Sequence, residues 1–140
     1  MTKSTADLLS ELEQCAEFRA FHQTNEPCLN DRSIADHLGE LLAQKGLKKA
    51  DVIRRSGLRE QYGYQIFTGY RVPERPKLLS VAVGMQLDLG ETQTLLKHAG
   101  YAALYAKNEF DCVVIFGLCK KMTVPEINLL LYEYGQELLG

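Results

Sequence analysis

Residues 46–73 read GLKKADVIRRSGLREQYGYQIFTGYRVP, and this stretch decides the fold. It contains two helix-length segments, at about residues 49–55 and 59–68, with Gly57 between them. Glycine readily adopts the left-handed conformation that ends many helices, so Gly57 and Gly69 mark the two stops. The segments are too close together for a β-α-β unit, and their spacing is typical of a helix-turn-helix.

The same part of the chain carries most of the positive charge. Residues 33–80 contain nine Lys and Arg against five Asp and Glu, a net charge of +4, whereas residues 1–32 and 81–140 each carry −3. The total of −2 therefore hides a basic centre between acidic flanks. A basic segment of this kind predicts contact with a polyanion, although a solvated helix face can have the same composition.

Further helices are predicted on both sides of residues 46–73. One begins after Ser33 and ends at Gly46, and two follow between Pro76 and Ala99. Together, residues 33–100 resemble the phage-repressor/Cro-like (XRE-type) helix-turn-helix family. The matching residues are Leu47, Val52, Gly57, Leu58, Ile66, Gly69, Arg71 and Pro73. The resemblance implies an all-α protein whose five-helix Cro/lambda-repressor-like domain binds double-stranded DNA as a transcriptional regulator.

The resemblance also implies roles for individual side chains. In such domains the second helix of the motif lies in the major groove, and its exposed polar side chains contact base edges. The implied base contacts are Glu60, Gln61, Tyr64 and Gln65. The implied contacts with the DNA backbone are Lys49, Tyr62, Arg71 and Arg75. Regulators of this type commonly bind two half-sites as homodimers.

Three residues depart from the family pattern. Gly63 stands where the family has an apolar core residue, Ile53 replaces a small residue, and Arg59 replaces a Ser or Thr cap. We expect the four aromatic rings within residues 62–70 to fill the space beside Gly63. The alternative is that the helix has been tuned for DNA contact or has drifted from it. Drift makes a helical protein-interaction adaptor the second functional hypothesis.

The last 65 residues contain an internal repeat. Residues 76–104 align with residues 111–139 at a shift of 35, with five identities. These are Glu91/Glu126, Leu95/Leu130, Leu96/Leu131, Gly100/Gly135 and Leu104/Leu139. Asp88 with Glu91, and Thr123 with Glu126, both have the spacing of a capping box. The repeat predicts two helical hairpins, and coincidence between two amphipathic hairpins is the alternative.

The run Cys112–Cys119 has no polar side chain other than its two thiols. Its β-branched residues allow a buried strand, but the repeat favours a buried helix. An isolated hairpin leaves one apolar face uncovered. We therefore expect this hairpin either to hold the chain together by packing on the rest of it or to pair two chains. As a homodimer interface, the best candidate residues are Ile115, Phe116, Leu118, Leu130 and Leu131.

The sequence thus predicts three parts: an acidic helical extension over residues 1–32, a helix-turn-helix domain over residues 33–104 and a C-terminal hairpin over residues 105–140. The extension is predicted to be one amphipathic helix from Ser4 to about His22. Neither a signal peptide nor an 18-residue apolar run is evident, so a cytoplasmic location is expected.

No catalytic or metal-binding pattern is evident in the sequence. The three histidines are scattered, and none has a second ligand three or four residues away. The four cysteines form no Cys-x-x-Cys pair, and there is no phosphate-binding glycine motif. We expect a non-enzymatic protein without metal or cofactor, and no small-molecule ligand can be inferred.

Overall fold

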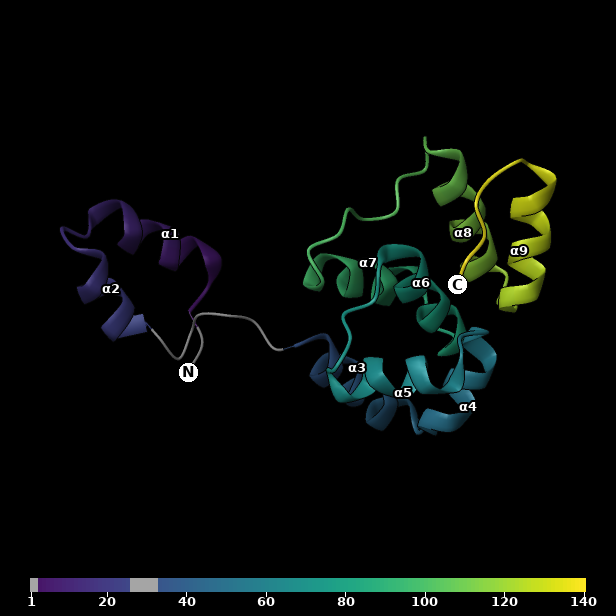
Figure 1. Ribbon diagram of the computed structural model, residues 1–140. Helices are drawn as coiled ribbons and strands as arrows, with labels where there is room; N and C mark the ends of the chain where they lie inside the picture. The colour runs from purple at the N-terminus through teal and green to yellow at the C-terminus, as the bar shows by residue number, and fades with distance from the viewer. Residues whose placement is uncertain (1–2, 26–32) are drawn as a thin grey trace. The chain divides into compact units, whose positions relative to one another are not determined.

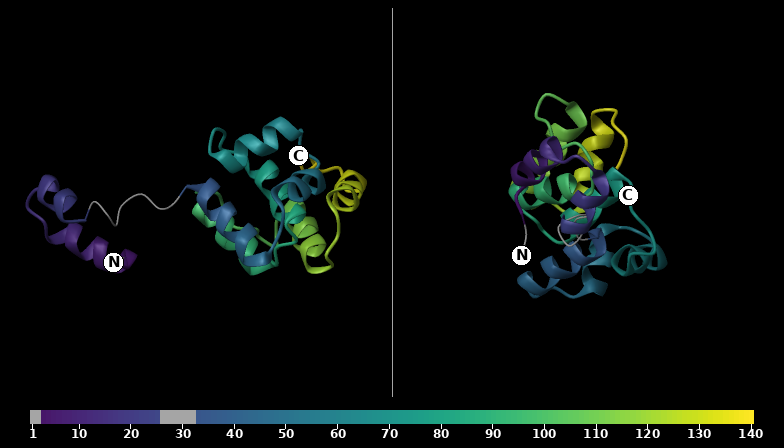
Figure 2. Two further views of the ribbon diagram at one scale, coloured as in Figure 1. Left: turned by 90° about the horizontal axis from the view of Figure 1, so that it is seen from below. Right: turned by 90° about the vertical axis from the view of Figure 1, so that its left-hand side faces the viewer.

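The computed structural model describes residues 3–25 and 33–140 (Figures 1 and 2). Every regular element in these residues is an α-helix, which confirms the predicted all-α class. The chain divides into two compact units, Met1–Arg32 and Ser33–Gly140, and each has its own packing.

Within residues 3–25, the N-terminal unit contains two short helices, α1 (Thr5–Gln14) and α2 (Phe18–Asn25). Ser4 caps α1 as predicted, but the prediction of a single helix is wrong because the backbone is extended at Cys15. The break lets α2 fold back, so that Phe21 is buried and the Asn25 amide donates to Glu11 at 3.4 Å. An unbroken helix would separate Asn25 from Glu11 by about 20 Å along its axis.

The second unit begins with three helices, α3 (Ile34–Lys45), α4 (Lys49–Ser56) and α5 (Glu60–Thr68). Their bounds agree closely with the predicted ones. Gly57 and Gly69 end α4 and α5 with φ of 75° and 85°, a region that side chains disfavour. Each helix buries one apolar face in a shared core, which includes Leu38, Val52 and Ile66.

The packing of α4 against α5 explains two of the departures from the family pattern. Gly63 is buried, and a Cβ there would lie 2.5 Å from Cγ2 of Ile53. The extra bulk of Ile53 therefore occupies the space that Gly63 leaves. The expectation that aromatic rings fill this space is wrong, because the nearest atoms beside Gly63 all belong to Ile53. Phe67 is buried in the core and Tyr62 is half-buried against it, whereas Tyr64 and Tyr70 are exposed.

The rest of the unit is made of two helical hairpins. The first comprises α6 (Arg75–Gly84) and α7 (Leu89–His98), and the second α8 (Glu109–Cys119) and α9 (Val124–Glu133). The apolar run of residues 112–119 lies in α8, so the helical prediction is confirmed. In Figure 1, α6 and α7 lie between α3–α5 and the second hairpin, and α6 packs on α4 as well as α9.

The two hairpins repeat each other in their hydrogen bonds as well as in their sequence. Both predicted capping boxes are present. Gln86 and Lys121, 35 residues apart, both have φ of 56° in the turn between the helices. The Gln93 side chain bonds the backbone N–H and C=O of Leu104, and the Asn128 side chain does the same to Leu139. The structure therefore contains the repeated hairpin that the sequence predicts.

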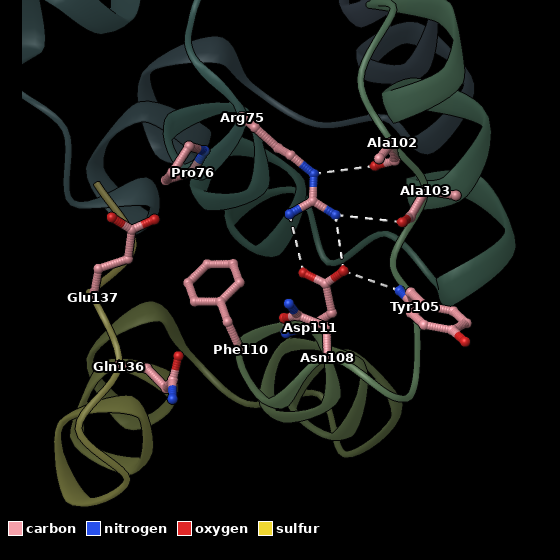
Figure 3. Close-up of a pocket in the computed structure, with 10 residues that line it drawn as sticks. All are labelled: Arg75, Pro76, Ala102, Ala103, Tyr105, Asn108, Phe110, Asp111, Gln136 and Glu137. Carbon is pink, nitrogen blue, oxygen red and sulfur yellow. Dashed lines mark hydrogen bonds and ion pairs between the residues drawn. The ribbon is translucent and has the colours of Figure 1, made fainter.

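An ion pair connects the starts of the two hairpins (Figure 3). The Arg75 guanidinium lies 3.0 Å from both carboxylate oxygens of Asp111 and also donates to the carbonyl oxygens of Ala102 and Ala103. Asp111 additionally accepts from the backbone N–H of Tyr105 at 3.0 Å. One apolar core continues through α3 to α9, so the second hairpin and helices α3–α5 share a single compact unit.

Candidate nucleic-acid interface

The exposed side of α5 brings together the four residues expected to contact bases. Glu60, Gln61, Tyr64 and Gln65 line one open hollow on this helix, together with Thr68. Glu60, Tyr64 and Thr68 lie four residues apart, and so do Gln61 and Gln65, so these two adjacent rows of side chains share one helical face. The opposite face is held in the core by Gly63, Ile66 and Phe67. The helix therefore presents a polar, solvent-facing strip, and its buried face fixes the orientation of this strip.

The loop after α5 holds one of these side chains in place. Nε of Arg71 donates to the Gln65 side-chain oxygen at 2.8 Å, and the Arg71 backbone N–H donates to the Gln65 carbonyl at 3.1 Å. The Arg71 guanidinium lies 5.8 Å from the centre of the Tyr62 ring, and Lys77 Nζ lies 5.6 Å from it. Two cations are thus gathered around Tyr62 at one edge of the polar strip.

Tyr62 itself is half-buried and lies outside the hollow. Burial raises the pKa of its phenol, and the charge of Arg71 partly opposes this shift. The phenol therefore stays protonated at neutral pH and can donate a hydrogen bond. In position and protonation Tyr62 remains compatible with the expected contact to a phosphate oxygen.

The start of α4 is a second position where cationic side chains gather. Lys48 occupies the N-cap and makes no side-chain cap bond, and Lys49 follows with its Nζ 5.9 Å from the centre of the Phe67 ring. Helix N-termini carry partial positive charge and free amide donors, which favour anions such as phosphate. α5 also lacks a side-chain cap, and its N-cap is Arg59.

Arg75 is not part of this surface. Its guanidinium is directed at Asp111 and at the carbonyl oxygens of residues 102 and 103, which leaves its side chain 23% exposed (Figure 3). A guanidinium used in this way is poorly placed to neutralise a phosphate. The structure therefore does not support the expectation that Arg75 contacts the DNA backbone.

Sequence reasoning missed two side chains that the structure places beside the expected ones. Thr68 lines the α5 hollow, and its position three residues after Gln65 could have indicated this. Arg54 lines a second hollow, between α4 and α5, with Glu60 and Tyr64. Arg54 is also paired with Asp51 at 3.1 Å, and that exposed pair is easily exchanged for another partner.

The part of the chain that the structure describes shows neither a metal site nor a membrane-spanning helix. Residues 3–25 and 33–140 contain no group of three or more His, Cys, Asp or Glu able to hold a metal ion. His37 and His98 stack with ring centres 4.8 Å apart, between α3 and α7. No helix within the described ranges is long and apolar enough to span a membrane.

Comparison with known proteins yields no relative. No protein-family model matches the chain, and none of the curated proteins or solved structures with which it was compared matches it.

Proposed function

We propose that this protein is a sequence-specific double-stranded DNA-binding regulator whose α5 reads bases in the major groove, in the manner of a Cro-like helix-turn-helix. The observation that carries the proposal is the polar strip on α5, where Glu60, Gln61, Tyr64 and Gln65 share one open hollow while the opposite face is buried. A helix fits the major groove, and carboxamides and carboxylates match the hydrogen-bonding edges of adenine and cytosine.

Positive charge at the edges of this strip supports the same proposal. Lys49 lies at the start of α4, and Arg71 lies beside the end of α5. In a helix-turn-helix complex the first helix and the flanking loops meet the phosphate backbone, while the second helix meets the bases. Lys49 and Arg71 would then anchor the protein, and Gln61 and Gln65 would discriminate among sequences.

A helical protein-interaction adaptor remains the alternative function, but Gly63 no longer favours it. Gly63 suggested a helix that had drifted from tight packing, whereas Ile53 explains the glycine as one half of a packed pair. The exposed apolar groove on the second hairpin is compatible with either function.

The proposal is tested by selecting bound sequences from a random duplex pool and measuring affinity for the selected site and for random DNA at several salt concentrations. Gln61→Ala should weaken the selected site by about 1–3 kcal/mol and change random DNA little. Lys49→Ala should weaken both alike and lower the salt slope by about one unit. Lys107→Ala, which removes an exposed lysine in the loop before α8, is the matched charge control.

Three results would contradict DNA reading. They are the absence of any selected sequence, an equal effect of Gln61→Ala on both kinds of DNA, or a loss with Lys107→Ala as large as that with Lys49→Ala. In each case the adaptor becomes the better account.

A further inference from the structure

The outer side of the second hairpin carries an apolar groove. It is lined by Glu109, Cys112, Val113 and Phe116 of α8 and by Leu130 and Tyr134 at α9. Phe116 is 49% exposed and Tyr134 is 58% exposed. An apolar groove between two helices is a typical place for a further helix to pack.

The repeat shows what covers the corresponding face of the first hairpin. At the shift of 35, Cys112, Phe116 and Cys119 correspond to Lys77, Val81 and Gly84.

In the first hairpin those three residues face the helix-turn-helix. Lys77 Nζ lies over the Tyr62 ring of α5, and a Cβ on Gly84 would lie 2.9 Å from the Val52 carbonyl oxygen of α4. Val81 is 1% exposed. The same face of the repeat unit is therefore buried by helices in the first hairpin and left open, among the described residues, in the second.

Charges at the two ends of this face indicate which helix would cover it. Glu109 and Lys120 are both exposed and stand at the start and the end of α8, with Phe116 between them. Lys120 Nζ lies 5.8 Å from the centre of the Phe116 ring, so it belongs to the same stripe.

When two copies of such a stripe meet antiparallel about a two-fold axis, each acid faces a base and the apolar parts face each other. A parallel arrangement would instead bring like charges together.

We propose that this groove binds a second copy of the chain, with α8 packed antiparallel against α8 of the partner and with Leu130 and Tyr134 flanking the seam. Glu109 of each copy lies beside Lys120 of the other, and the two Phe116 rings fill the centre. The proposed interface does not depend on DNA binding. A monomeric chain would contradict the dimer alone, and a failure to bind DNA would contradict the proposed function alone.

This interface differs from the one that the sequence predicts. Leu118 and Leu131 are 4% and 0% exposed because they belong to the core that α3–α9 share. Ile115 is half-buried and does not line the groove, whereas Phe116 and Leu130 do. The sequence predicted an uncovered apolar face on an isolated hairpin, but it could not show which side of that hairpin packs on α6 and α7.

The first test is the mass of the full chain in solution by sedimentation equilibrium, without DNA, between about 1 and 100 μM. The wild-type chain should be a dimer in this range, and Phe116→Ser should weaken the dimer at least about tenfold. Leu129→Ser is the control, since Leu129 is 62% exposed on α9 and does not line the groove. A monomeric wild type, or equal effects of the two substitutions, overturns the proposal.

The second test addresses the antiparallel pairing. Glu109→Lys and Lys120→Glu each place like charges together in a homodimer, so each should weaken self-association about tenfold. An equimolar mixture of the two variants should recover association near the wild-type level, because each charged pair in the heterodimer again joins an acid to a base. Circular dichroism of each variant checks that it is folded. Folded variants that associate as the wild type does, or a mixture no better than its components, overturn the antiparallel seam.

Discussion

The hairpins α6–α7 and α8–α9 have the same turn, the same capping boxes and the same side-chain clamp on the following backbone, yet they differ in their surroundings. The first is covered by α3–α5 on one side and by the second hairpin on another. The second hairpin shows Phe116 to solvent where the first buries Val81. The same hairpin structure is thus an internal layer in the first hairpin and a surface element in the second.

The ion pair of Arg75 with Asp111 has no counterpart under the repeat, because the corresponding residues are Phe110 and Pro76. We expect Asp111→Ala to lower the free energy of unfolding by about 3–5 kcal/mol, since it leaves the Arg75 guanidinium without its buried acid. Urea unfolding measures this change.

Asp51→Ala is the control for the same experiment. It breaks the exposed pair with Arg54, which is worth about 0.5 kcal/mol. Equal losses for the two substitutions would show that the pair between the hairpins contributes no more than a surface contact.

The helix crossings inside the two hairpins differ at one pair of positions. Gly117 lies so close to Ile127 that an added Cβ would be 2.5 Å from Ile127 Cγ1 and Cδ1. The first hairpin has Ala82 and Thr92 at the same positions. Gly117→Ala should therefore destabilise the protein by about 1–3 kcal/mol through overpacking.

Transferring both residues of the first hairpin tests that explanation. The double variant Gly117→Ala/Ile127→Thr should recover part of the loss, and a double-mutant cycle of thermal unfolding measures the coupling. Additive losses would contradict the view that the two residues are matched by volume.

Local features of both hairpins and of helices α3–α5 could be predicted from the sequence. Helix ends were predictable because they depend on local caps such as Ser33, Gly57 and Thr123. The four residues of the polar strip on α5 were expected from the resemblance to the Cro-like family, and helical spacing explains why their side chains share one face.

Features that depend on distant partners were not predictable in the same way. Arg75 looked available because Asp111 lies 36 residues further along the chain. Gly63 and Ile53 were each noted as departures, and only their contact shows that they compensate for each other.

The side-chain clamps should differ in effect although they are alike in geometry. Gln93→Ala and Asn128→Ala each remove two hydrogen bonds to backbone, worth about 1–3 kcal/mol together. Gln93 holds the connection between the two hairpins, whereas Asn128 holds the segment after α9, which no further helix of the described chain follows. We expect Gln93→Ala to be the more destabilising, and amide hydrogen exchange at Leu104 and Leu139 to rise only in the matching variant.

The smallest expected effect is the pH dependence of the second capping box. The backbone N–H of Thr123 donates to the Glu126 carboxylate at 2.8 Å, and this bond, aided by the Thr123 hydroxyl, lowers the pKa of Glu126. Because the folded pKa lies below the unfolded one, the stabilisation is present above the unfolded pKa and disappears as pH falls through the folded pKa.

Glu126→Gln keeps a side chain that can accept the same hydrogen bond but cannot titrate. The stability difference between wild type and Glu126→Gln should therefore favour the wild type near neutral pH and shrink as the solution is acidified below the unfolded pKa. A carbon NMR titration of the Glu126 carboxyl checks the direction of its pKa, and a difference that grows on acidification would show that the carboxylate is not what stabilises this cap.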